Sequence, residues 1–249
     1  MLTHFPLRGA RVRIPLPALM LNPVSFLYEG LLERGIANSP IPVNHILLVL
    51  DETDLLSDAR GMEKLKHFVR WCHELTIDII SVYISVVHDG MDRSVSKDVY
   101  SHLGAEIATA LGKEGVSLVI YGDKSEREPV YAKFSEDGKG ANGRRITVSV
   151  GFGGRNELTK VAKEIAKRVK TGAIEPEEID EKLIESELLF KSEPDLVVRS
   201  GATRLMDFLI WQSVYTEFYF TDMNWVNFRK IDFLRAVRDF KMRERRFGR

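Results

Sequence analysis

The sequence predicts an α/β fold in which a central parallel sheet is flanked by helices. Two observations predict it: strand-like and helix-like segments alternate along the chain, and the clearest strands are continuous apolar runs. Continuous runs are typical of strands buried on both faces of a parallel sheet, whose strands are joined by helical crossovers. With 249 residues, 44% of them hydrophobic, the chain is long enough for one large domain with helices on both faces of the sheet.

Each predicted element follows from its own pattern, namely an apolar run for a strand or apolar residues every three to four positions for a helix. The predicted strands are 45–51, 77–87, 116–122, 145–154, 195–200 and 217–220. The predicted helices are 58–75, 96–112, 155–170, 176–189, 204–212 and 229–244. The segment 123–144 is polar and contains glycines, which predicts an exposed excursion.

No change in composition divides the chain, so the sequence predicts a single domain over 24–249, preceded by a poorly defined extension at 1–23. The domain opens on an amphipathic segment at 24–36. Its simplest interpretation is an ordinary helix that packs on the domain. The alternative is a docking helix for a membrane surface or a partner, which would present Phe26, Leu27, Leu31 and Leu32.

Composition excludes several classes of function. The 36 basic and 36 acidic residues balance, which argues against a nucleic-acid partner. The single cysteine, Cys72, excludes internal disulfides and cysteine-based zinc sites, and fits a cytoplasmic setting. The six histidines form no metal-binding pattern, no G-x-S-x-G elbow is present, and no apolar run is long enough to cross a membrane.

Two features follow predicted strands, at the edge of a parallel sheet where ligands usually bind: Asp51, and the turn RSGATR at 199–204. Gly201 allows the backbone to approach a ligand closely, and the guanidinium groups of Arg199 and Arg204 suit phosphate oxygens. The alternative is that both arginines are surface residues in ion pairs.

Two other segments have a functional and a plain interpretation. Near the C-terminus, Arg246 and Gly248 belong either to a solvated basic tail or to a phosphate contact. The run GFGGR at 151–155 lacks the spacing of a dinucleotide or Walker motif, so a tight strand-to-helix turn explains it.

Several longer segments carry a family resemblance: PDLVVRSGATRLMDFLIWQSVYTEFYFTDMNW, GFGGRNEL, VRWCHELTIDIISVYI and RERRFG. From about residue 24 to its end, the chain resembles the cis-prenyltransferases, the family of undecaprenyl and dehydrodolichyl diphosphate synthases. The resemblance implies that family's fold, called undecaprenyl diphosphate synthase-like, and a dimer.

The resemblance also implies roles for individual residues. Arg199 and Arg204 would bind the diphosphate of isopentenyl diphosphate, and Arg246 and Gly248, the R-x-G motif, would complete this site across the dimer. Asp51 stands where the family's metal-binding aspartate stands. It is the first candidate ligand for Mg²⁺, and Glu217 is the second.

The first loop departs from the family pattern. The family has D-G-N-G-R-W-A after the first strand, whereas this chain has LDETDLLSDARGMEKL, with Glu52, Thr53 and Leu55 in place of glycine, asparagine and arginine. Asp58 stands near the expected histidine, SVVHDGMD lacks the family's serine, asparagine and tryptophan, and Met206 replaces a serine. Acidic residues at the place where a diphosphate must bind would weaken the binding free energy by about several kcal/mol, because like charges repel at close range.

These losses predict a chain that is inactive alone. The pattern is similar to that of the family's non-catalytic subunits, such as the Nogo-B receptor. The expected function is therefore an accessory subunit of a heterodimeric or heterotetrameric cis-prenyltransferase, which contributes its R-x-G tail to a catalytic partner. That partner would hold most of the Mg²⁺ and make long polyprenyl diphosphates for glycan carriers such as dolichol, in the cytoplasm or at a membrane surface.

Two alternatives remain open. The first is a divergent, self-sufficient homodimeric transferase, which needs another source of positive charge near the first loop, for which Arg60, Lys64 and Arg93 are candidates. The second is a non-enzymatic protein that docks a complex on a membrane through 24–36.

Overall fold

The computed structural model describes residues 22–86, 93–112, 117–122, 131–133, 143–151, 153–188, 193–201 and 211–243. Among these residues, no helix is both long and apolar enough to cross a membrane. The helices are α1 (Asn22–Ala37), α2 (Glu52–Leu56), α3 (Ala59–Glu74), α4 (Arg93–Leu111), α5 (Gly154–Lys170), α6 (Glu181–Glu187) and α7 (Lys230–Met242). The strands are β1 (His45–Asp51), β2 (Ile79–Ser85), β3 (Ser117–Gly122), β4 (Tyr131–Lys133), β5 (Arg145–Val150), β6 (Leu196–Ser200) and β7 (Glu217–Thr221).

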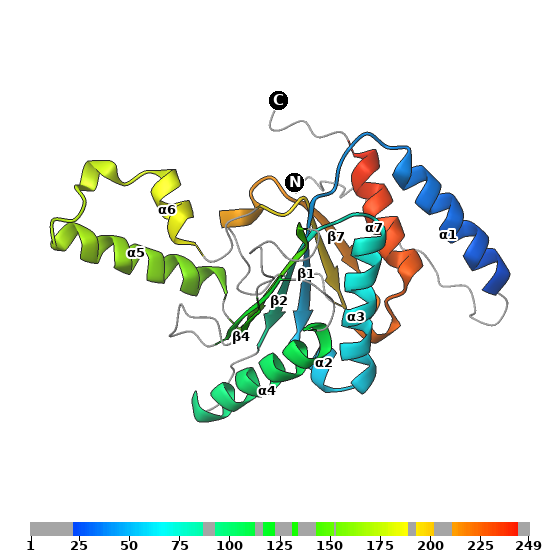
Figure 1. Ribbon diagram of the computed structural model, residues 1–249, viewed down its shortest axis with the longest axis horizontal. Coiled ribbons are helices and arrows are strands. Elements are labelled where there is room, and N and C mark those ends of the chain that lie inside the picture. Colours follow the sequence, from blue (N-terminus) through cyan, green and yellow to red (C-terminus); the bar gives the residue numbers. More distant parts are fainter. Residues whose placement is uncertain are drawn as a thin grey trace, which may run out of the picture.

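The strands form one seven-stranded sheet in the order β4-β3-β5-β2-β1-β6-β7 (Figure 1). Six strands are parallel, and β4 pairs antiparallel with β3 at one edge. From β1, the chain first builds toward β2 and later returns to add β6 and β7 on the other side. The junction of β1 and β6 is therefore a topological switch point, and in open α/β sheets such a crevice is where ligands bind.

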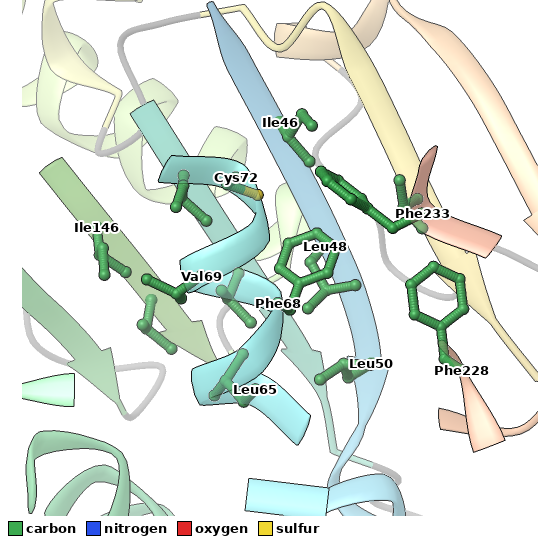
Figure 2. Packing of buried hydrophobic residues seen from close by; sticks show 14 of the residues in the cluster. Ile46, Leu48, Leu50, Leu65, Phe68, Val69, Cys72, Ile146, Phe228 and Phe233 are labelled. Carbon is green, nitrogen blue, oxygen red and sulfur yellow. The ribbon is translucent and has the colours of Figure 1, made fainter. Parts of the chain in front are cut away.

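The main core lies between the sheet and helices α3, α4 and α7, with α1 packed outside α7 (Figure 1). Phe68 of α3 is fully buried at its centre and makes edge contacts with the rings of Trp225 and Phe233. Figure 2 shows Phe68 and Phe233 lying over Leu48 of β1. The apolar stripe of α3 that the sequence predicts is confirmed, because it is the surface that covers β1.

The opposite face of the sheet has a smaller cluster made of Leu47, Val49, Tyr83, Val197 and Phe218. All five are strand residues. The alternation of strands and helices predicts helices on both faces of the sheet, but in the described part of the chain the helices cover one face more than the other. Helices α5 and α6 instead project away from the sheet (Figure 1) and pack on each other through a separate apolar cluster.

Two further predictions differ from the structure. The predicted helix at 176–189 is divided into a 3-10 turn at Pro176–Glu178 and the short α6, because Asp180 caps α6 by accepting a hydrogen bond from Leu183 N. The predicted excursion at 123–144 includes β4, whose three residues are too short to give a recognisable strand pattern. The predicted helix at 204–212 lies mostly outside the described residues.

Candidate functional site at the junction of two strands

Asp51 and Arg199 end neighbouring parallel strands at the switch point. Asp51 is the last residue of β1, and Arg199 lies on β6 opposite Val49. Arg199 Nη2 donates to Asp51 Oδ2 over 2.7 Å, which joins the two strand ends by an ion pair. The prediction that both lie at the carboxyl edge of the sheet is confirmed, while their direct pairing was not predicted.

The guanidinium of Arg199 is buried and only partly satisfied. Its side chain is 3% exposed, and within the described ranges its Nε and Nη1 atoms have no hydrogen-bond partner. An unpaired buried donor costs about 1–3 kcal/mol, and more when it is charged, so these two donors call for an explanation, and a bound ligand is one. Nε and Nη1 lie on different edges of the guanidinium, on either side of the Nη2 that binds Asp51, and each can donate separately to an oxygen of a phosphate.

The carboxylate of Asp54 lies beside this ion pair. Asp54 Oδ2 accepts a hydrogen bond of 2.9 Å from the backbone N–H of Asp51 and so holds the first turn of α2. Burial raises the pKa of Asp54, and the neighbouring Asp51 carboxylate raises it further, while the Asp51 N–H and the Arg199 guanidinium lower it. The acidic first loop that the sequence predicts is thus part of the site.

The turn after β6 has the geometry that its glycine predicts. Gly201 has a φ of 76°, in the left-handed region that favours glycine, and its N–H donates to Thr221 O. Ser200 Oγ donates to Met223 O over 2.6 Å, which ties the same turn to the end of β7. Arg204 lies beyond this turn, outside the described residues.

The GFGGR segment is a strand-to-helix turn, as predicted. Gly151 has a φ of 69°, and a Cβ there would lie 2.3 Å from the ring of Tyr100, so only glycine fits. In the first turn of α5, the buried Glu157 accepts a hydrogen bond from Gln212 over 3.0 Å. Sequence reasoning missed this pair, although both residues lie within the quoted motifs, because nothing in the spacing indicates that they meet.

The remaining predicted site residues are not brought to Asp51. Glu217 begins β7, opposite Leu196, so it lies toward the amino end of the strands, where it pairs with Arg243. The side chains of Asp51 and Glu217 are therefore at different ends of the sheet within one chain. Arg246 and Gly248 lie outside the described residues.

Three basic residues were predicted as alternative sources of positive charge near the first loop, and the structure describes the side chains of two of them. Arg60 is exposed and pairs with Asp58 through a contact of 2.6 Å. Lys64 lies 5.9 Å from the centre of the Trp71 ring, on the side of α3 that faces α7. The side chain of Arg93 is outside the described part of the structure.

The carboxylates near Arg199 could hold Mg²⁺ only together with the phosphates of a substrate. No group of three or more possible metal ligands exists among the described residues. Mg²⁺ is usually held by one or two carboxylates together with substrate phosphates, and Asp51, 33% exposed and paired with Arg199 through one oxygen, offers one such carboxylate.

Comparison with known proteins places the chain in one family of prenyltransferases. Residues 52–248 match the prenyltransferase family described as "Putative undecaprenyl diphosphate synthase". The chain is 31% identical to a tritrans,polycis-undecaprenyl-diphosphate synthase (geranylgeranyl-diphosphate specific) of Methanocaldococcus jannaschii, over 89% of this chain and 88% of the relative. It is 30% identical to an isoprenyl transferase of Thermus thermophilus, over 92% and 97% of the two chains.

Among solved structures, the fold is similar to lavandulyl diphosphate synthase from Lavandula x intermedia in complex with dimethylallyl diphosphate. The TM-score is 0.65 at 25% identity, over 83% of this chain and 98% of that one. The predicted fold class is confirmed.

The prediction of an accessory subunit is wrong. The relatives that match nearly the whole length of the chain are named as a synthase and a transferase, and these matches give no support to a Nogo-B-receptor-like subunit or to a catalytic partner. The error came from reading the acidic first loop as the loss of catalytic activity, although the relatives that carry this family's fold over nearly their whole length are named as a synthase and a transferase.

Proposed function

Because the chain belongs to the undecaprenyl diphosphate synthase family of prenyltransferases, we propose that it is a self-sufficient cis-prenyltransferase. It condenses isopentenyl diphosphate onto an allylic diphosphate and makes a long polyprenyl diphosphate. The observation that carries the proposal is the buried Arg199 guanidinium, which has two donors free at the switch point of the sheet. The name of the Methanocaldococcus relative supports geranylgeranyl diphosphate as the allylic primer.

Arg199 binds and orients a diphosphate in this proposal. Its Nε and Nη1 donate to the phosphate oxygens, while Asp51 holds Nη2 and fixes the plane of the guanidinium. The orientation is set before the substrate arrives, because the side chain is buried and its Nη2 is held by Asp51. Arg204, and Arg246 and Gly248 of a second copy, are proposed to supply further contacts to the same diphosphate.

Mg²⁺ is proposed as the cofactor, with Asp51 as its protein ligand. When bound, the ion neutralises charge on the diphosphate that leaves the allylic substrate. Asp54, beside Asp51, adds negative charge that attracts a cation and repels a phosphate, so the metal and the diphosphate are expected to bind together.

Turnover by the purified chain tests the proposal. The chain is incubated with labelled isopentenyl diphosphate, geranylgeranyl diphosphate and Mg²⁺, and the extracted products are separated by chain length. We expect long-chain products without any second protein. Product that forms only after a second family member is added would contradict self-sufficiency.

Asp54→Asn is expected to lower the KM for the diphosphate substrates. The amide oxygen still accepts the hydrogen bond from the Asp51 N–H, but the negative charge beside the phosphates is gone, which corresponds to about a threefold to tenfold change. The pKa of Asp54 is raised, so the wild-type carboxylate loses its charge at a higher pH than an ordinary aspartate. The KM values of variant and wild type should therefore converge as pH falls.

Steady-state kinetics over a pH series check this expectation. A KM that rises in the variant, together with a higher Mg²⁺ requirement, would mean that Asp54 helps to hold the metal and that its charge favours binding.

Two finer features belong to the proposal. The active form is a homodimer, which light scattering of the purified chain tests. Exposed apolar residues along the edge strand β7 support it, namely Val214 and Tyr215 before the strand and Phe220 near its end. The chain also works at a membrane surface, because its product carries a long apolar tail.

A further inference from the structure

Helix α1 has two apolar faces, and among the residues that the structure describes only one of them is covered. Leu32 and Ile36 are buried against the domain, where α1 packs along α7. Leu27 and Leu31, one helical turn apart, are 69% and 64% exposed. Packing on α7 therefore explains the first face and leaves the second unexplained.

The charges of α1 are arranged around the exposed leucines. At about 100° per residue, Arg34 shares the face of Leu27 and Leu31. The acidic residues point elsewhere: Glu33 pairs with Lys230 of α7 over 2.9 Å, and Glu29 lies four residues before it on the same side. The exposed face is thus apolar with a basic end.

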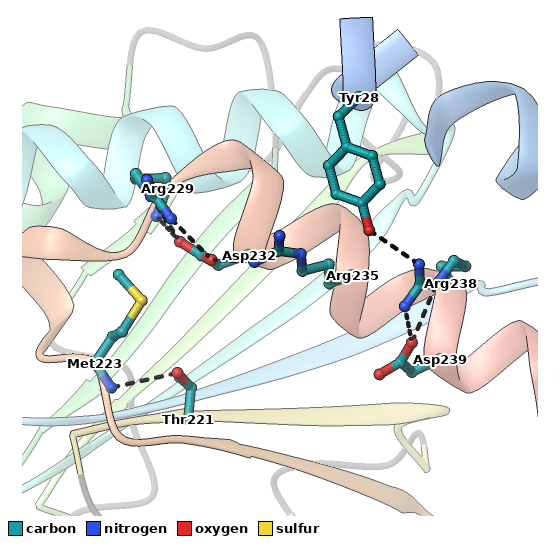
Figure 3. A network of polar contacts seen from close by, with 8 residues as sticks. All are labelled: Tyr28, Thr221, Met223, Arg229, Asp232, Arg235, Arg238 and Asp239. Atoms are coloured by element: carbon teal, nitrogen blue, oxygen red, sulfur yellow. Dashed lines mark hydrogen bonds and ion pairs between the residues drawn. The ribbon is translucent and has the colours of Figure 1, made fainter. Parts of the chain in front are cut away.

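Aromatic and basic groups border this face toward α7. Tyr28, next to Leu27, lies over α7, where its hydroxyl accepts a hydrogen bond of 3.3 Å from Arg238 (Figure 3). The guanidinium carbon of Arg235 lies 5.3 Å from the centre of the Tyr28 ring. Arg235 pairs with Asp232 and Arg238 with Asp239, so this border is polar but carries little net charge of either sign, and Arg34 is the cation on the exposed face itself.

The segment before α1 has the same chemical character. Residues 1–21 contain Arg8, Arg11 and Arg13 and no aspartate or glutamate, and many of the others are apolar. These are the features of a helix that lies in a membrane interface. Such a helix has leucines on one side, arginines and a tyrosine beside them, and here it follows a segment that is basic and apolar.

We propose that the Leu27–Leu31 face of α1 docks on an anionic lipid surface. The two leucines enter the acyl boundary, Tyr28 and the arginines lie at the level of the lipid phosphates, and the remainder of the domain stays in water. The proposal extends the proposed function, in which a lipid product is made at a membrane. The surface itself is argued from side chains that have no part in the candidate site.

Vesicle sedimentation of the full chain tests the proposal. The probes are vesicles of phosphatidylcholine alone and of phosphatidylcholine mixed with phosphatidylglycerol. We expect the chain to pellet with the mixed vesicles and to be released by salt. The double variant Leu27→Ser/Leu31→Ser should bind at least about tenfold more weakly, because both apolar insertions are lost.

Ile179→Ser is the matched control, since Ile179 is an exposed apolar residue on the projecting α5–α6 hairpin. We expect it to bind the vesicles like the wild type. Wild-type protein that does not pellet with the mixed vesicles, or a double variant that binds as well as the wild type, would overturn the proposal.

Two further measurements identify the other occupants of this face. Lower oligomeric mass in the double variant would make the face an interface between two copies and overturn membrane docking. Vesicle binding that is lost on removal of residues 1–21, yet is unchanged in the double variant, would place the membrane contact in residues 1–21 and would also overturn docking through Leu27 and Leu31. Transferase activity with a water-soluble primer should persist in the double variant, so that failure of docking is distinguishable from failure of the proposed function.

Discussion

Arg199→Met should lower kcat/KM for isopentenyl diphosphate by about 10²–10³-fold, the usual result of removing an electrostatic group that holds a reacting charge. Methionine fills a similar volume but offers no donor to a phosphate. Asp51, the partner left behind, is one-third exposed and can be solvated, so the fold should survive the change. Steady-state kinetics, with circular dichroism to confirm folding, measure the effect.

Arg199→Lys is the matched control. Lysine keeps the charge but loses the planar fork, so we expect an intermediate loss of about tenfold, mainly in KM. A methionine variant with wild-type kinetics would show that the free donors of Arg199 do not face the substrate. The proposed role of the β1–β6 junction would then be abandoned.

Gly61→Ala should lower the free energy of unfolding by about 2–3 kcal/mol, because it places a methyl group where there is no room. Gly61 lies in the first turn of α3, and a Cβ there would be 2.1 Å from the backbone oxygen of Asp54 in α2. The helices would have to separate, which would also strain the hydrogen bond from Trp225 Nε1 to Gly61 O, 2.9 Å long. Urea denaturation measures the change.

Gly35→Ala provides the comparison for this variant. Gly35 is also helical, but a Cβ there would meet no atom within 4 Å, so alanine should stabilise the chain by up to about 1 kcal/mol. If Gly61→Ala stabilised the chain as Gly35→Ala does, helix propensity rather than the close approach of α2 and α3 would govern Gly61.

The sequence predicts the fold well wherever an element is long and its pattern is decided by burial. The run at 45–51 and the stripe of α3 are of this kind, since each needs an apolar partner on a known side. The strand β4 and the division of 176–189 were missed because a three-residue edge strand and a capped turn leave almost no periodic signal. Among the described residues, the unequal cover of the two sheet faces was missed because alternation alone does not say on which face each helix lies.

The candidate site could be predicted in part. Strand ends in a parallel sheet meet at one edge, so the placement of Asp51 and Arg199 follows from their positions after apolar runs. Their pairing depends on strand order, because it requires β6 to lie beside β1, and no local pattern encodes that order. Catalytic capacity was misjudged for a related reason: the acidic residues of the first loop were weighed by their charge alone, without the cation that the fold places against them.

The ion pair between Asp51 at the end of β1 and Arg199 of β6 also affects which anions would bind at this junction. A plain anion such as sulfate or chloride meets an arginine whose charge is already matched by a neighbour, and it must tolerate that neighbour at close range. In the proposed function, a diphosphate that brought its own divalent counter-ion would avoid this penalty, because the carboxylate of Asp51 would face a cation and the guanidinium of Arg199 would face a phosphate. The resting molecule would thus discriminate against common salts in solution without any gate or moving part.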